Sequence, residues 1–93
     1  MGDIEAMLKI TAIYDNGGKT VDRYTVVLHK IQHYPFTGVP PHTYACLSLS
    51  DDPISPQGFS QFGPCILGDH LGKEIRFEDL PENVKEHIRK RLE

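Results

Sequence analysis

An Asn-Gly-Gly turn between two alternating segments constrains the fold of this chain more than any other feature of the sequence. The turn is Asn16-Gly17-Gly18, and Asn-Gly is the strongest short-range hairpin signal because both residues accept a positive φ. Apolar residues recur with period 2 on either side of it, as in half-buried strands. The first apolar face consists of Leu8, Ile10, Ala12 and Tyr14, and the second of Tyr24, Val26 and Leu28. We therefore predict an antiparallel hairpin over residues 7–29.

Three more extended segments follow the hairpin. Residues 43–50 predict a third strand, residues 59–67 a short strand broken at Gly63-Pro64, and residues 73–77 a last strand or extended segment. Residues 32–42 and 51–58 separate these segments. We expect both to be loops, because proline fixes φ and short polar side chains bond their own backbone in such stretches.

The C-terminal region has the pattern of an amphipathic helix. Asp79 is the expected N-cap, Pro81 stands in the first turn, and Glu82 completes a capping box with Asp79. The apolar stripe steps by four and consists of Leu80, Val84, Ile88 and Leu92. A helix of this length is not stable alone in water, so its stripe must pack on the sheet.

Together these elements predict an α+β fold, a mostly antiparallel sheet of four or five strands with one C-terminal helix packed on one face. With 93 residues the chain has room for a single domain, residues 1–93. The apolar runs are only a few residues long, as in residues 26–28, which excludes a transmembrane helix. The net charge of −3 argues against a protein that mainly grips nucleic acid.

The cysteine content indicates the compartment. The chain holds two cysteines, Cys46 and Cys65, whereas a secreted domain this small normally carries four or more as a disulfide framework. We expect both to be reduced, free of metal and packed as small apolar side chains. A cytoplasmic location is the corresponding expectation.

Several phrases of the sequence occur together in a recognisable combination. They are YDNGGKT from Tyr14, DRYTVV from Asp22, SPQGFSQ from Ser55, HLGK from His70 and FEDLP from Phe77. In these phrases the chain resembles a group of small uncharacterised proteins from bacteria and their phages. The resemblance implies a phage or prophage setting, in which small inhibitors and binding proteins are common, and brings no activity with it.

Two cofactor motifs fail on their spacing. Gly18-Lys19-Thr20 matches only the end of a phosphate-binding loop, because the earlier glycine of that motif is replaced by Ile13. A strand rather than a helix is also expected after it. Five histidines are present, His29, His33, His42, His70 and His87, but no pair has the spacing of a known zinc arrangement. We therefore expect neither a cofactor nor a metal.

A small hydrolase is the alternative from the enzyme class. In such an enzyme, Cys46 or Ser60 would be the nucleophile and His70 would be paired with it. However, no nucleophile elbow or other family signature is present, so we expect no catalytic residue. A structural oligomer, in which an exposed sheet edge pairs between subunits, is a third class.

The leading hypothesis is a small non-catalytic binding protein. Its ligand would be polar or anionic, for example a nucleotide signal that a phage protein sequesters, or else one protein partner. We expect the site where the loop 50–61 meets the turn 16–23, provided that both reach the same end of the sheet. Arg23 would bind phosphate or carboxylate with two hydrogen bonds, and Phe59 or Tyr24 would offer a ring for stacking. The candidate ligand-binding residues are Lys19, Arg23, Tyr24, Ser55, Gln57, Phe59, Ser60 and Gln61. We expect neither a membrane nor nucleic acid among its partners, and a homo-oligomer is an open alternative.

Overall fold

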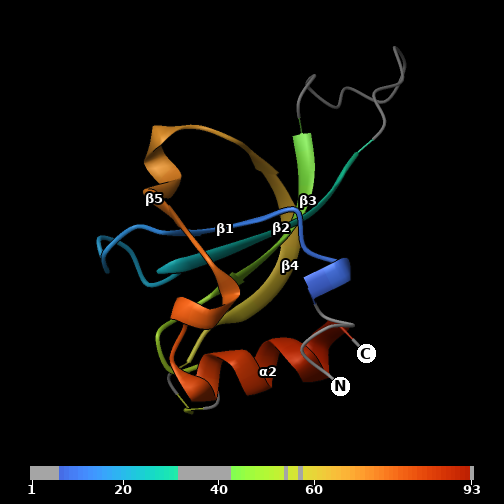
Figure 1. Cartoon of the computed structure of the whole chain (residues 1–93). Coiled ribbons are helices and arrows are strands. Elements are labelled where there is room, and N and C mark those ends of the chain that lie inside the picture. The colour runs from blue at the N-terminus through green and yellow to red at the C-terminus, as the bar shows by residue number, and fades with distance from the viewer. Residues whose placement is uncertain (1–6, 32–42, 54, 57, 93) are drawn as a thin grey trace.

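The computed structural model of this chain describes residues 7–31, 43–53, 55–56 and 58–92. The predicted loop over residues 32–42 lies outside them. The described part is an α+β fold whose five strands form one antiparallel sheet in the order β4-β3-β2-β1-β5 (Figure 1). The strands are β1 Ala12–Asp15, β2 Tyr24–Lys30, β3 Thr43–Leu49, β4 Ser60–Ile66 and β5 Lys73–Ile75. Two short 3₁₀ turns, η1 Asp69–Leu71 and η2 Phe77–Asp79, precede the C-terminal helix α2, Glu82–Leu92.

The first hairpin forms as the turn signal predicts, with β1 pairing antiparallel to β2. Its first strand is shorter than expected, because β1 begins at Ala12 and Leu8 is 82% exposed. Its faces are also exchanged: Ile13, at 2% exposed, points into the core instead of Ala12 and Tyr14. The sequence around Ile13 has apolar residues at both parities, so alternation alone does not choose the inward face. Packing against the helix decides it.

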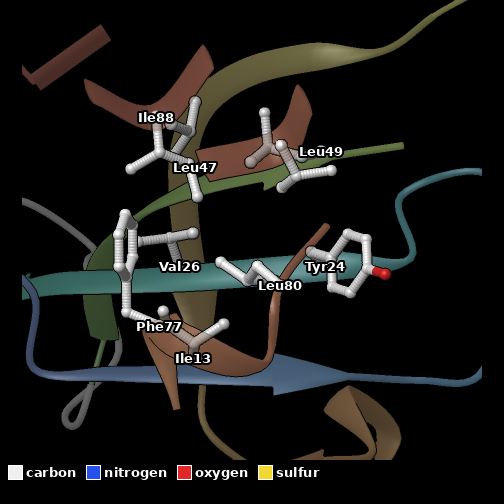
Figure 2. Close-up of a cluster of buried hydrophobic side chains, with 9 residues drawn as sticks. Ile13, Tyr24, Val26, Leu47, Leu49, Phe77, Leu80 and Ile88 are labelled. Atoms are coloured by element: carbon white, nitrogen blue, oxygen red, sulfur yellow. The ribbon is translucent and has the colours of Figure 1, made fainter. Parts of the chain in front are cut away.

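One row of side chains crosses the sheet beneath the helix. Ile13 lies opposite Val26 on β2, and Val26 lies opposite Leu47 on β3. The row belongs to a buried cluster in which the helix contributes Val84 and Ile88, both fully buried (Figure 2). Antiparallel neighbours on one face approach closely, so this row presents a continuous apolar surface to α2.

The apolar stripe of the helix packs as predicted, but its start differs from the prediction. Asp79 does not cap α2; its carboxylate accepts a hydrogen bond from the Arg76 N–H at 3.0 Å and closes the turn η2. The helix begins at Glu82, where the Pro81 carbonyl accepts the first helical bonds. Leu80 is extended, with φ −76° and ψ 149°, because a residue before proline avoids the helical region.

The edge strand β4 runs through Gly63-Pro64 without the predicted break. The Phe59 carbonyl accepts from the Ser50 N–H, so the backbone N–H and C=O groups of odd-numbered residues in this strand point toward β3 and those of even-numbered residues point outward, away from the sheet. The nitrogen of Pro64 therefore lies on the outward side, where it has no N–H to offer. Proline in an edge strand interrupts the row of donors that another strand could pair with. The opposite edge, β5, has only three residues.

The two cysteines are joined, contrary to the prediction that they are reduced. Cys46 on β3 and Cys65 on β4 form a disulfide with their Cα atoms 6.1 Å apart, within the usual range. In the register of this pair, Cys46 lies opposite Gly63 and Cys65 opposite Tyr44, so the bridge runs diagonally between neighbouring strands. Eighteen residues separate the cysteines in the sequence, and only the β3–β4 pairing brings them together.

Truncation of the helix stripe tests the core. Ile88→Ala should lower the free energy of unfolding by about 2–5 kcal/mol, because a fully buried side chain is lost and a cavity remains. Chemical denaturation followed by circular dichroism measures this change. Glu86→Ala, an exposed position on the same helix, serves as the control and should cost far less. Equal stabilities of the two variants would contradict the packing of α2 on the sheet.

Restoration of the missing donor tests the role of Pro64. The strand β4 carries no charge, and its Phe62 and Ile66 side chains are exposed. Pro64→Val adds an outward N–H to this strand, so self-association should increase relative to the wild type. Sedimentation velocity over a concentration series measures it. Pro56→Val, which changes a proline in the loop, should leave the association state unchanged. A folded Pro64→Val variant that associates no more than the wild type would show that this proline does not protect the edge.

Candidate functional site

The sheet topology brings two separate loops to one end. Tyr24 at the start of β2 lies opposite both Asp15 at the end of β1 and Leu49 at the end of β3. The turn between β1 and β2 and the loop between β3 and β4 therefore emerge side by side. This meets the condition that the sequence left open for a site between them.

A cleft of about 570 Å³ lies between these two loops. Charged and hydroxyl side chains predominate in its walls. The lining residues are Gly18, Lys19, Thr20, Val21 and Arg23 from the turn, and Ser50, Asp51, Asp52, Ser55 and Gly58 from the loop. An open cleft with charged side chains in both walls suits a ligand that carries charged and hydrogen-bonding groups.

The turn uses its backbone amides internally. The Gly17 N–H donates to the Asp15 carboxylate at 2.8 Å, and the N–H groups of Gly18 and Lys19 donate to the Asn16 side-chain oxygen at 2.9 and 3.1 Å. Gly17 and Gly18 have φ of 77° and 86°, which only glycine adopts readily. These amides hold the turn in shape, so they do not form the anion cradle that glycine-rich loops can provide.

The loop after β3 is fixed by its own contacts. The Ser50 hydroxyl accepts from the Phe59 N–H at 2.9 Å, and the Asn83 side chain on α2 donates to the Asp51 carbonyl at 3.3 Å. Gly58 packs so closely that a Cβ there would lie 2.3 Å from the Asp52 carbonyl oxygen. A larger residue at position 58 would therefore displace this wall of the cleft.

Arg23 is held in place from two sides. Its guanidinium donates to both carboxylate oxygens of Asp15, from Nε at 2.9 Å and from Nη2 at 3.2 Å. The guanidinium carbon also lies 5.3 Å from the centre of the Tyr24 ring, within cation–π range. The hydrogen bond from Arg23 lowers the pKa of Asp15 below its usual value, although burial opposes the shift. Arg23 thus pairs with Asp15, and its side chain remains 34% exposed at the cleft.

The two walls of the cleft carry opposite charge. Lys19 and Arg23 lie on the turn, while the exposed Asp51 and Asp52 lie on the facing loop. Since Asp15 offsets the charge of Arg23, the cleft as a whole is not strongly cationic. Its charge pattern matches a ligand that has an anionic group at one end and hydrogen-bond donors at the other.

Of the eight candidate residues, Lys19, Arg23 and Ser55 line the cleft. Tyr24 lies beneath it in the core at 4% exposed, so a ligand cannot stack on its ring; burial also raises the pKa of this tyrosine. Phe59 and Gln61 line a separate, smaller hollow of about 230 Å³. The remaining two candidates divide: Ser60 contacts the helix, and Gln57 lies outside the described residues.

The hydrolase arrangement is not formed. Cys46 is bonded to Cys65 and is 1% exposed, so it is not a nucleophile in this state. The Ser60 hydroxyl lies 2.7 Å from Nε2 of His87, whereas His70 lines a hollow with Cys65 elsewhere on the molecule. Side chains alternate between the two faces of β4, and that of Ser60 lies on the face that α2 covers, so its partner is His87 rather than His70.

Sequence reasoning missed the partner of Arg23 and the acidic wall. Asp15 stands at the last position of the first strand, so the hairpin register itself could have placed it beside Arg23. Asp51 and Asp52 belong to the loop predicted over residues 51–58 and are not among the eight candidate residues. Only the meeting of the two loops sets their carboxylates across from Lys19.

The described residues offer little support for other site classes. Among them, no three His, Cys, Asp or Glu side chains are grouped closely enough to hold a metal ion, and His33 and His42 lie outside the described residues. No helix in the described part of the chain is long and apolar enough to cross a membrane.

Comparisons with protein-family models, with curated proteins and with solved structures find no match for this chain.

The burial of His87 between the helix and β4 predicts a pH dependence of stability. Burial lowers the pKa of His87 below 6.5, helped by the positive charges of Arg91 and Lys90. The unfolded chain then binds a proton more readily than the folded chain, so this contribution to stability is complete above pH 6.5 and declines as the pH falls through the lower folded pKa.

Unfolding by denaturant between about pH 7 and pH 5 measures this effect. His87→Gln should reduce the loss of stability over that range. Ser60→Ala, which keeps the burial and the neighbouring charges, should retain it. If wild type and His87→Gln lost stability in parallel, the neutral form of His87 would not be the one that the fold favours.

Proposed function

We propose that this chain is a small non-catalytic binding protein that holds a polar, negatively charged small molecule in the cleft between the turn 16–23 and the loop 50–58. The observation that carries the proposal is the charge pattern of that cleft. Its two cations stand on one wall and its two exposed carboxylates on the other.

This pattern favours a nucleotide-like ligand. A phosphate or carboxylate group would lie against Lys19 and Arg23, because charge-assisted hydrogen bonds to cationic side chains are the strongest available there. Asp51 and Asp52 accept hydrogen bonds only, so they suit the amino and hydroxyl groups of a base or a sugar. A purely anionic ligand without such donors would meet repulsion from the acidic wall.

Arg23 supports the proposal through its fixed orientation. The pair with Asp15 uses Nε and one N–H of Nη2, two of the five donors that a guanidinium carries. The remaining donors keep a set direction because Asp15 and the Tyr24 ring hold the group. A ligand therefore loses less conformational freedom from this side chain than from a mobile one.

The setting is part of the same proposal. The resemblance to small proteins of bacteria and their phages supports an inhibitor or sequestering protein, with a nucleotide signal as its ligand; the cytoplasmic location expected from reduced cysteines loses that support, because Cys46 and Cys65 are bonded. A single protein partner at the same cleft is the competing form of this proposal. A structural oligomer has less support, since one sheet edge carries Pro64 and the other is three residues long.

Calorimetry with a panel of nucleotides, including cyclic dinucleotides, tests the proposal. One or more members should bind the wild type, and Lys19→Ala and Arg23→Lys should each weaken that binding about tenfold or more, because the first removes a cation and the second removes the guanidinium's hydrogen bonds. Gln57→Ala tests the one candidate beyond the described residues. Lys30→Ala, at the far end of β2, is the matched control and should bind like the wild type.

Two outcomes would contradict the proposal in different ways. Tight binding that Lys19→Ala and Arg23→Lys leave unchanged would put the ligand at another site. An absence of binding across the whole panel would exclude the nucleotide class and favour the protein partner.

A further inference from the structure

We propose that Cys46 and Cys65 form a reversible thiol–disulfide couple, which small thiols of the glutathione class open by reaction at the sulfur of Cys65. This inference is independent of the cleft and of the proposed ligand. It rests on the unequal environments of the two sulfur atoms and on the hollow that exposes one of them.

The two cysteines differ in accessibility because they stand on different strands. Cys46 lies on β3, inside the sheet, and is 1% exposed. Cys65 lies on the edge strand β4 and is half-buried. A dissolved thiol therefore reaches Cys65 and not Cys46, and access decides which sulfur of a disulfide is attacked.

A hollow of about 560 Å³ leads to Cys65. It is mostly apolar and is lined by Thr43, Pro64, Cys65, Ile66 and His70. The exposed His70, from η1, brings an imidazole to the same hollow. An imidazole close to a cysteine stabilises the thiolate form, which Cys65 takes when it leaves the mixed disulfide and when it attacks oxidised glutathione in the reverse reaction.

The register leaves space for both states of the couple. Gly63 stands directly opposite Cys46, and a Cβ at Gly63 would meet no atom within 4 Å. The sulfur of Cys46 thus has room to part from Cys65 without displacing a side chain across the strand pair. The seven paired positions of β3 and β4 hold the two strands together when the bridge is open.

The exchange is balanced as two displacements. A thiolate RS⁻ attacks Sγ of Cys65, forms a mixed disulfide there, and breaks the bond to Cys46, whose sulfur leaves and takes up a proton. A second RS⁻ attacks the R sulfur of the mixed disulfide, releases RSSR and leaves Cys65 as a thiolate, which takes up the second proton. Protein disulfide and two RSH thus give protein dithiol and RSSR, and oxidised glutathione drives the reverse reaction.

Redox titration of the native wild type is the main test. The protein is equilibrated with mixtures of reduced and oxidised glutathione, trapped with an alkylating reagent and mapped by peptide mass spectrometry. We expect the disulfide to convert to two alkylated cysteines within the series, and the mixed disulfide to appear on Cys65. A bridge that persists in reduced glutathione alone, one that never forms in oxidised glutathione, or a mixed disulfide confined to Cys46 would overturn the proposal.

Single variants test the asymmetry and the role of His70. The Cys65 thiol of Cys46→Ser should react with a maleimide at least about tenfold faster than the Cys46 thiol of Cys65→Ser, because reactivity follows exposure and thiolate content. In the Cys46→Ser background, His70→Gln should slow labelling near neutral pH and not at high pH, where the thiol is ionised anyway. His87→Gln, on the helix, is the matched control.

Circular dichroism confirms that each variant is folded, and the mapping of the wild type does not depend on any variant. Equal labelling rates for the two cysteines would contradict the access argument. Labelling unaffected by His70→Gln at every pH would remove His70 from the proposal.

Discussion

The apolar row formed by Ile13, Val26 and Leu47 is the surface on which the rest of this structure depends. It crosses the three strands β1, β2 and β3, and the helix α2 covers it with Val84 and Ile88. A sheet of this size needs such a layer, because an isolated hairpin is at best marginally stable in water. The same packing fixes the faces of the strands, since a shift by one residue would turn every inward side chain outward.

The fixed faces and the antiparallel order also create the cleft. With β2 between β1 and β3, the turn after β1 and the loop after β3 share one end of the sheet. Arg23 stands where the turn meets the core: Asp15 and the Tyr24 ring hold its guanidinium, and its outer side borders the cleft. The buried ring thus serves the site indirectly, by orienting a charged side chain rather than by contacting a ligand.

The edge strand β4 shows how the position of a residue along a strand decides its role. In β4, the side chain of Cys65 lies on the same face of the sheet as that of Cys46 and reaches it diagonally, while the backbone nitrogen of Pro64 points outward, away from β3. The proline interrupts the outward row of donors, and the neighbouring cysteine carries the covalent link to the interior of the sheet. One short segment therefore combines protection of the edge with the redox chemistry that we propose.

Local sequence determined the elements whose signals lie within a few residues of one another. The Asn16-Gly17-Gly18 turn, the strands it joins and the apolar stripe of α2 follow from positive φ, period-2 alternation and period-3.6 alternation, and all three are present. Only the tertiary structure decided that Ile13 faces the helix, that Cys46 meets Cys65, and that Asp51 lies across from Lys19. Each of these depends on contacts between residues far apart in the chain, and such contacts follow from strand order and from packing on the helix, which no local pattern encodes.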